Sequence, residues 1–359
     1  MTRRAFIIAE AGVNHDGSLA VAKELIDVAA EAGADAVKFQ TFRANDLVAR
    51  QAPQAEYQRR NLQRTESQAD MIRRLELLPD EFRELAAHGI RRGIRFLSTP
   101  FDQLSLAFLV DELAMDRIKL SSGDITNGPL LLSAARTGLP VILSTGMSVP
   151  ADIEAALAVL AWGYSFTDGN PGLAALHETY KSAEGQAMVS AKVTLLQCTS
   201  EYPAPPIDVN LRVMATLARD FGVATGLSDH TAGVAIAVAA AAMGANVIEK
   251  HFTLDRKRPG PDHRASLEPD ELRRLVAEIR QVEDALGTPI KQIMPSEGMN
   301  QAIGRRSLVA LCPIAVGEVF TEENLGTKRP GTGISPMHYW DYLGRAATRA
   351  YSLDEAIEP

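Results

Sequence analysis

Two histidines end two short apolar runs, and their placement suggests a metal site. His230 closes the run that starts at Gly226, and His251 closes the run that starts at Ile248. Both runs are typical of β-strands, and the small residues between them predict a helix. The two imidazoles would then emerge at one edge of a sheet, where their nitrogens suit Mn²⁺, Fe²⁺ or Zn²⁺. The competing interpretation is that each histidine is an ordinary buried hydrogen-bonding residue.

Lys38 and Lys119 stand near the ends of two further apolar runs. Because alternate residues of a strand face the same side, Lys38 and Gln40 should both point to the interior, where an unpaired ammonium is costly. Two interior lysines with hydroxyls nearby predict a pocket for phosphate and carboxylate groups. The hydroxyls that we expect there belong to Thr99, Ser122, Ser144 and Ser228. The alternative is that each lysine extends to the rim or pairs with Glu10.

A different chemistry is also open to the lysines. Lys38, Lys119 or Lys250 could form a Schiff base with a carbonyl substrate, as in class I aldolases. Such an aldolase needs no metal, so the histidine pair argues against this interpretation without excluding it.

The remaining histidines carry weaker signals. In the loop from Gly260 to His263, we expect Asp262 to be the functional residue and His263 its neighbour. Asp262 or Glu10 could add an oxygen ligand to the metal or support the ligands. His15 follows the first predicted strand, where it would line the pocket or cap the first helix. No role is assigned to His88, His177 and His338.

Short β-like runs alternate with helix-like segments along most of the chain. We predict strands at 6–11, 36–41, 95–99, 117–121, 141–145, 193–198, 223–228 and 246–251. Segments rich in Ala, Leu, Glu and Arg predict helices at 19–31, 79–92, 151–162, 211–221 and 269–286. Eight β/α units in about 285 residues are the pattern of a TIM (β/α)8 barrel. Polar residues gather at the carboxyl ends of the predicted strands, which is the active-site face of this fold.

The pattern changes after residue 286. We predict a barrel domain over 1–286, a linker over 287–304 and a small mixed domain over 305–359 that is too small to be an independent enzyme. An insertion at 163–190 separates the fifth helix from the sixth strand. Because connections from helix to strand lie opposite the active-site face, we expect this insertion to serve structure or assembly.

Composition limits the partners. The chain has 359 residues, of which 46% are hydrophobic, and a net charge of −8 without a block of Lys or Arg. It can bury a full core, and nucleic acid is not an expected partner. The apolar run before Glu10 is too short for a signal peptide or a membrane span, so we expect a cytoplasmic protein without membrane contact. Cys198 and Cys312 lie in apolar runs and should be buried, reduced thiols.

Ten motifs taken together resemble the N-acetylneuraminate (sialic acid) synthase family, which includes legionaminate and pseudaminate synthases. They are AEAGVNHDG (9–17), VKFQT (37–41), STPF (98–101), KLSSGD (119–124), LSTGM (143–147), QCTSEYP (197–203), GLSDH (226–230), EKHFT (249–253), GPDH (260–263) and KRPG (328–331). The resemblance extends over essentially the whole chain. It implies a TIM barrel followed by a small antifreeze-like (SAF, β-clip) domain, in a domain-swapped homodimer where each SAF domain covers the partner's active site.

The resemblance also implies a role for each matching residue. Phosphoenolpyruvate would be held by Lys38, Thr99, Lys119, Ser122, Ser144 and Ser228. A divalent metal, usually Mn²⁺ with Mg²⁺ or Co²⁺ as substitutes, would be bound by His230 and His251. The open-chain amino sugar would be surrounded by Glu10, Gln40, Asn61, Tyr202, His251 and Asp262, and contacted by Arg329 of the partner subunit. Glu10, Asp124 and His251 would take part in catalysis, although Asp124 stands where several bacterial relatives have glutamate.

The reaction implied by the resemblance is that of a transferase. Phosphoenolpyruvate, water and an N-acylated amino sugar such as N-acetylmannosamine would give N-acetylneuraminate and phosphate, by carbon–carbon bond formation and C–O cleavage. Legionaminate or pseudaminate synthases, which use a 2,4-diacetamido-2,4,6-trideoxyhexose, carry the same motifs. Alternatives of a different class are a Schiff-base aldolase and a catalytically silent carbohydrate-binding protein.

Overall fold

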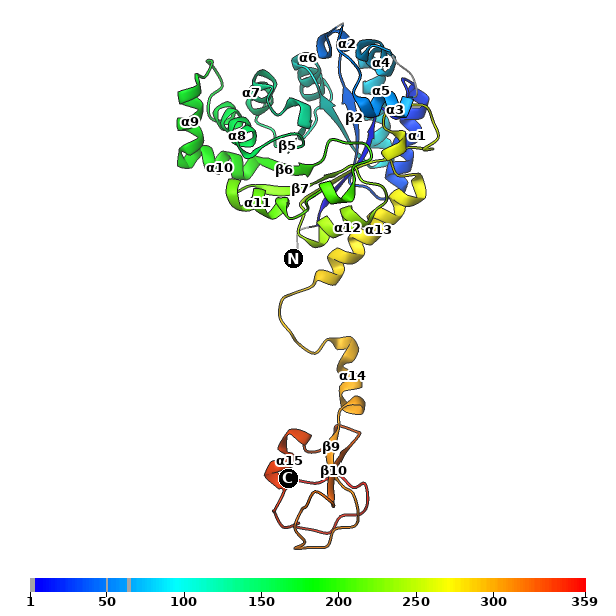
Figure 1. Ribbon diagram of the computed structural model, residues 1–359, viewed down its shortest axis with the longest axis vertical. Coiled ribbons are helices and arrows are strands. Elements are labelled where there is room, and N and C mark those ends of the chain that lie inside the picture. The colour runs from blue at the N-terminus through cyan, green and yellow to red at the C-terminus, as the bar shows by residue number, and fades with distance from the viewer. Residues whose placement is uncertain (1–3, 50, 63–65) are drawn as a thin grey trace. The chain divides into compact units, whose positions relative to one another are not determined.

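The computed structural model describes residues 4–49, 51–62 and 66–359. The chain divides into two compact units, residues 1–287 and 288–359, and each is described by itself (Figure 1). Within the described residues, every helix is too short or too polar to span a bilayer.

The first unit is built on one sheet of eight parallel strands. They are β1 (Phe6–Gly12), β2 (Ala36–Thr41), β3 (Arg95–Pro100), β4 (Ile118–Leu120), β5 (Val141–Ser144), β6 (Val193–Cys198), β7 (Ala224–Asp229) and β8 (Val247–His251). Their order is β3-β2-β1-β8-β7-β6-β5-β4, and the outermost strands β3 and β4 contact each other. The sheet is therefore a nearly closed barrel, and the predicted TIM barrel is confirmed.

Helices surround this barrel (Figure 1). They are α1 (Leu19–Glu31), α2 (Ala44–Leu47), α3 (Glu56–Leu62), α4 (Gln68–Leu75), α5 (Pro79–Arg92), α6 (Gln103–Ala107), α7 (Gly128–Arg136), α8 (Pro150–Ser165), α9 (Leu173–Lys181), α10 (Ala183–Lys192), α11 (Val213–Phe221), α12 (Ala235–Ala242) and α13 (Pro269–Leu286). The five predicted helices correspond to α1, α5, α8, α11 and α13. Both α5 and α13 begin at a proline, which suits the first helical position because no partner is needed there for an N–H.

The insertion at 163–190 is helical. It contains the end of α8, all of α9 and most of α10, and both added helices pack against α8. Because α10 leads directly into β6 at Val193, the insertion joins the sheet at an amino end, opposite the carboxyl ends that bear the predicted site.

The segment between β2 and α5 forms an excursion that the sequence did not predict as helical. It contains α2, α3 and α4, and residues 50 and 63–65 within it lie outside the described part. Phe42, Met71, Ile72 and Leu75 of this excursion form a buried cluster with Val13, which follows β1. The excursion is thereby attached to the carboxyl end of the barrel.

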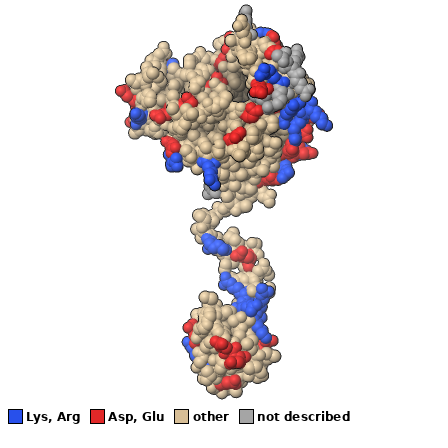
Figure 2. All heavy atoms as spheres, in the orientation of Figure 1, with Lys and Arg blue, Asp and Glu red and all other residues tan. Residues whose placement is uncertain are grey.

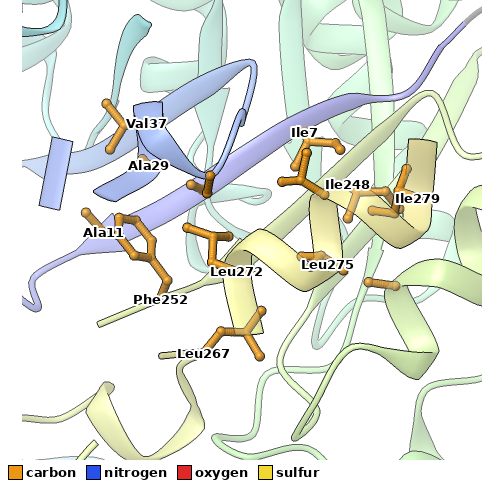
Figure 3. Close-up of a cluster of buried hydrophobic side chains, with 14 of the residues drawn as sticks. Ile7, Ala11, Ala29, Val37, Ile248, Phe252, Leu267, Leu272, Leu275 and Ile279 are labelled. Carbon is orange, nitrogen blue, oxygen red and sulfur yellow. The ribbon is translucent and has the colours of Figure 1, made fainter. Parts of the chain in front are cut away.

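Apolar side chains on the outward faces of the strands hold the helices in place. Ile7 of β1 and Ile248 of β8 belong to one buried cluster with Leu272, Leu275 and Ile279 of α13, as Figure 3 shows. Each buried aliphatic side chain stabilises the fold by about 1.5–3 kcal/mol. The cluster therefore fixes β1 and β8, which are neighbours in the sheet.

The inward faces carry an apolar layer that fills the barrel. Its residues are Ile8, Ala36, Leu97, Ile142, Leu196 and Val247. Gly226 is on the same level of β7, where a Cβ atom would lie only 2.2 Å from the carbonyl oxygen of Val247. Alternation along each strand places the next inward side chain two positions later, nearer the carboxyl end. Those next residues are Glu10, Lys38, Thr99, Ser144, Cys198, Ser228 and Glu249.

The second unit is small and has its own core. It contains α14 (Pro295–Gly304), the antiparallel strands β9 (Ser307–Ala310) and β10 (Leu325–Lys328), and the short helix α15 (Tyr339–Tyr342). Its buried cluster includes Leu308, Phe320, Leu325 and Tyr351. The helix α14 lies within the stretch that we interpreted as a linker.

The two cysteines differ in their surroundings. Both are free; Cys198 is buried and Cys312 is exposed. The prediction that both thiols are buried is therefore wrong for Cys312, because it lies in the exposed bend that follows β9.

Replacing Gly226 with alanine tests the packing of the barrel interior. The added Cβ must push β7 away from β8, and overpacking of this kind typically costs about 1–3 kcal/mol. We expect Gly226→Ala to lower the free energy of unfolding by that amount in urea denaturation followed by circular dichroism. The control is Gly128→Ala in α7, where the new Cβ meets nothing within 4 Å. Equal stability of Gly226→Ala and the unchanged protein would contradict this description of the interior.

Candidate active site

A cavity of about 710 Å³ lies at the carboxyl ends of the barrel strands. Twelve residues singled out from the sequence line it, namely Glu10, Lys38, Gln40, Thr99, Lys119, Ser122, Ser144, Tyr202, Ser228, His230, His251 and Asp262. The barrel thus brings the predicted cations, hydroxyls and imidazoles together at one place.

Four charged side chains form a buried cluster at the bottom of this cavity. The Lys38 ammonium lies 2.5 Å from Glu10 and 3.6 Å from Glu249, and Lys119 lies 3.2 Å from Glu249. Lys38 also donates a hydrogen bond of 2.9 Å to Thr99. The side chains of Lys38, Glu10 and Glu249 are no more than 3% exposed. Lys38 therefore does not reach for the rim, and the pairing with Glu10 that the sequence left open is present.

Glu249 is a member of this cluster that the sequence analysis did not single out. It is buried, it contacts both lysines, and its carboxylate accepts a hydrogen bond of 2.9 Å from Ser228. The signal was available, because Glu249 and His251 are two positions apart on one strand and must face the same side.

The two carboxylates of the cluster differ in their protonation. Burial raises the pKa of Glu10 to about 7, although Lys38 opposes the shift. Burial acts in the same direction on Glu249, but Lys119 and Lys38 outweigh it and lower the pKa of Glu249 to about 2. Near neutral pH, Glu249 is therefore ionised while Glu10 is partly protonated. Two ammonium groups then face little more than one carboxylate, and the surplus positive charge can attract an anion.

His230 and His251 meet at the upper part of the cavity, with ring centroids 5.3 Å apart. The Nδ1 atom of His230 lies 2.7 Å from the carbonyl oxygen of Thr199, so Nδ1 carries a proton. Burial opposes the charged form of His230, but Cys198 and the Thr199 carbonyl outweigh it and raise the pKa of this ring. In the neutral ring, Nε2 holds the lone pair. Burial, together with His230 and Lys38, holds the pKa of His251 well below its usual range. Its Nδ1 atom is buried without a hydrogen-bond partner. His251, and His230 in its neutral form, can therefore offer a lone pair.

These features fit a divalent metal held by two histidines. Among the described residues, no group of three or more His, Cys, Asp or Glu side chains is arranged to hold a metal ion. Neither Glu10 nor Asp262 is thus placed as a third ligand beside the pair. The protein would supply two nitrogens, and water or substrate oxygens would fill the other positions, as in catalytic rather than structural sites.

Further polar groups, from β2 and from loops, line the same cavity. The ring of Tyr202 lies 4.1 Å from that of His230, and Gln40 is within 3.5 Å of Glu10. Burial raises the pKa of Asp262 to about 6. Asn61 does not line the cavity; it is buried and donates a hydrogen bond of 2.7 Å to the carbonyl oxygen of Pro261. Its position supports the loop that carries Asp262.

A further predicted site residue of the first unit, Asp124, does not line the cavity. The Asp124 carboxylate accepts hydrogen bonds from Ser121 at 2.6 Å and from Asn127 at 3.2 Å, within its own turn. Its short side chain is occupied locally and does not line the cavity. Arg329 is exposed on the second unit, where it follows β10.

The remaining lysine and histidine candidates face elsewhere. Lys250 is paired with Asp229 on the outward face of β8, so it does not suit a Schiff base in the cavity. His263 lies between Thr253, at 2.7 Å, and Asp16, at 3.0 Å. His15 is fully buried, and its Nδ1 accepts a hydrogen bond from the backbone N–H of Gly17. His15 and His263 thus stabilise the loops around the cavity and do not line it.

Two family models match the chain. The model of the NeuB family matches residues 25–291, and that of the SAF domain matches residues 305–357. The first covers more than half of the chain.

Similar proteins agree with these matches. The chain is 46% identical to the N,N'-diacetyllegionaminic acid synthase of Campylobacter jejuni over 99% of both chains. It is 42% identical to the synthase of the same name from Legionella pneumophila, over 94% of this chain and 89% of the relative. A crystal structure of N-acetylneuraminic acid (sialic acid) synthetase from Leptospira borgpetersenii in complex with citrate has a TM-score of 0.65 at 33% identity, covering 83% of this chain and 90% of that one. The chain therefore belongs to the NeuB family, that of the sialic acid synthases.

Proposed function

We propose that the protein condenses phosphoenolpyruvate with an open-chain N-acylated amino sugar and water, and releases a nonulosonic acid and phosphate. The observation that carries this proposal is one cavity with two buried lysines beside two facing imidazoles. Phosphoenolpyruvate needs cations for its phosphate and carboxylate, and the aldehyde of the sugar needs a Lewis acid. Similarity to synthases of such acids supports the assignment.

The charged cluster is the proposed site of phosphoenolpyruvate. Lys38 and Lys119 would balance its negative charge, with Thr99, Ser122 and Ser228 as neighbouring hydroxyls. The Oγ atom of Ser144 is buried in the same cavity with no hydrogen-bond partner among the described residues. Leaving a buried donor without an acceptor costs free energy, and a ligand oxygen that accepts a hydrogen bond from it would remove this cost. This unsatisfied hydroxyl supports an anion site rather than a purely structural ion cluster.

The reaction joins two carbons and removes phosphate. The C3 carbon of phosphoenolpyruvate would attack the aldehyde carbon, water would add to C2, and the bond between C2 and the phosphate oxygen would then break. A divalent cation held by His230 and His251, with Mn²⁺ expected and Mg²⁺ or Co²⁺ as substitutes, would polarise the aldehyde oxygen.

Glu10 is the proposed proton carrier. Its raised pKa lets it give a proton to the aldehyde oxygen near neutral pH, and the Lys38 ammonium stabilises the carboxylate that results. The same carboxylate can then take a proton from the water that adds to C2. Asp124, which the sequence also put forward, is bonded within its own turn. Its placement gives less support to a direct role.

The wall of the sugar side is apolar, and this favours a sugar with methyl groups. The apolar lining residues come mainly from the excursion after β2, namely Phe42, Leu47, Val48, Ala49, Ala52, Ala55, Met71, Ile72, Leu75 and Phe101. A 2,4-diacetamido-2,4,6-trideoxyhexose presents a C6 methyl and two acetyl methyls, whereas N-acetylmannosamine has a hydroxyl at C6. We therefore propose the diacetamido sugar as the preferred substrate and N-acetylmannosamine as the second candidate. The two diacetyllegionaminic acid synthases among the relatives support this order.

For the assembly, we propose a homodimer in which the second unit of each subunit covers the cavity of the partner. We propose the cytoplasm as its location. The second unit carries exposed Arg305, Arg306, Lys328 and Arg329, and Figure 2 shows basic side chains gathered at the end of α14. Such a patch complements substrates that carry negative charge.

Phosphate release tests the proposed reaction. The purified protein is incubated with phosphoenolpyruvate, Mn²⁺ and either sugar, with and without EDTA. We expect release that requires the sugar, is abolished by EDTA and restored by excess Mn²⁺, and has a kcat/KM at least tenfold higher for the diacetamido sugar, the scale on which a pocket distinguishes a methyl group. Turnover that survives EDTA but is lost with borohydride would favour the Schiff-base aldolase, and no release with any sugar would favour the silent barrel.

Replacing Arg329 tests the proposed contribution of the second unit. We expect Arg329→Ala to raise the KM for the sugar at least tenfold, because the proposed contact to its acylamino group is lost, while the Kd for Mn²⁺ stays within twofold. Steady-state kinetics and manganese titration give the two values. Arg345→Ala, which removes another exposed arginine of the same unit, is the control. Loss of both properties, or of neither, would contradict this role.

A further inference from the structure

A second buried ion pair lies on the other side of the strands that carry the two histidines. The Lys250 ammonium is 2.8 Å from the Asp229 carboxylate, and both side chains are 0% exposed. Lys250 also donates to the carbonyl oxygen of Thr231 at 2.5 Å. The second carboxylate oxygen of Asp229 accepts from the backbone N–H and the hydroxyl of Thr231, at 2.9 and 2.8 Å. The three residues thus form one hydrogen-bonded group.

The position of this group links it to the imidazoles. Asp229 directly precedes His230, and Lys250 directly precedes His251. Alternation along the strands turns Asp229 and Lys250 outward where the histidines turn inward. Asp229 and Lys250 are also the last residues that face each other in the pairing of β7 with β8. The ion pair is therefore located at the point where the paired strands end and the two histidines begin.

Beyond that point the strand ladder no longer fixes His230. Its segment leaves β7, and no ladder pair to β8 extends past Asp229 in the described residues. The bonds from Lys250 to Thr231 and from Thr231 to Asp229 cross this gap. They join the turn that carries His230 to the strand that carries His251. The residues that make these bonds, Asp229 and Thr231, directly flank His230 in the sequence.

We propose that Asp229 and Lys250 are positioning residues that set the separation of His230 and His251 and thereby the affinity for the divalent cation. Burying two charges is costly, and a well-packed apolar pair would serve stability as well. An ion pair with fixed hydrogen bonds offers what an apolar pair does not, a defined position of the turn. A metal site needs its ligands within about 0.5 Å of the binding geometry, so a small shift of the turn weakens binding. The inference rests on the proposed function in that the two histidines hold the cation.

A control for this proposal is the ion pair of Arg280 and Asp35, at the opposite end of the barrel. Arg280 of α13 lies 2.6 Å from Asp35, and the Asp35 carboxylate accepts a hydrogen bond of 2.7 Å from the backbone N–H of Ile7 in β1. This pair also ties strands and a helix together, but it lies at the amino ends of β1 and β2. Its loss should weaken the fold without moving the histidines.

The experiment compares two double variants of the full-length chain. Asp229→Asn with Lys250→Met removes the Asp229–Lys250 pair without leaving a lone buried charge. Asp35→Asn with Arg280→Met removes the Asp35–Arg280 pair, and it also takes the arginine away from Glu283. Manganese affinity is measured without substrates from the electron paramagnetic resonance signal of free Mn²⁺, and stability is measured by urea denaturation. We expect the Kd for Mn²⁺ to rise at least tenfold in the first double variant and to stay within twofold in the second, even where both lose stability.

Three outcomes would overturn the proposal: an unchanged Kd in the first variant, an equal rise in both variants, or no binding by the unchanged protein. The last outcome alone would also refute the proposed metal site, so failures of the two proposals are distinguishable. If the first double variant does not fold, Thr231→Val replaces it, because this change removes the hydroxyl bond to Asp229 and leaves the ion pair itself intact. The expected rise in Kd is then about threefold or more, and an unchanged value would again overturn the proposal.

Discussion

The buried cluster of Lys38, Lys119, Glu10 and Glu249 is the constraint on which the rest of the site depends. Charges removed from water must be paired, and no other described part of the barrel interior gathers as many of them. The apolar layer below closes the barrel to water from the amino end, while the cavity opens above. The cluster therefore lies where an anion can reach it from one side only, and the low pKa of Glu249 leaves Glu10 as the carboxyl group that can exchange a proton.

Three successive levels of side chains inside the barrel have different roles. The apolar layer gives rigidity, the charged level above it suits an anion, and the imidazoles of His230 and His251 stand above that. The excursion after β2 adds an apolar wall beside this column, and loops add Tyr202 and Asp262. Because the inward residues of each strand are two positions apart, one register of the sheet places all three levels together. A shift by a single residue would turn every functional side chain toward the helices.

The sequence sufficed for the barrel because each strand and its helix carry strong local patterns, and motif resemblance sufficed for most residues of the cavity. The sequence did not suffice where contacts between distant segments determine the surroundings of a side chain. Glu249 has the same parity as His251, yet only the packed barrel brings it between the two lysines. Asp124 matches a motif, but Ser121 and Asn127 engage its carboxylate within the turn. The helices α2 to α4 are too short for a clear period, and their packing against the barrel holds them.

Direct binding tests the proposed phosphoenolpyruvate site in the charged cluster without the sugar or the reaction. Isothermal titration of phosphoenolpyruvate in the presence of Mn²⁺ should compare the unchanged protein with Lys119→Met and with the control Lys181→Met, which changes an exposed lysine of α9. We expect a Kd at least a hundredfold higher for Lys119→Met, in line with about 3 kcal/mol for a charge-assisted contact, and no change for the control. Equal affinity of Lys119→Met and the unchanged protein, with both folded by circular dichroism, would contradict it.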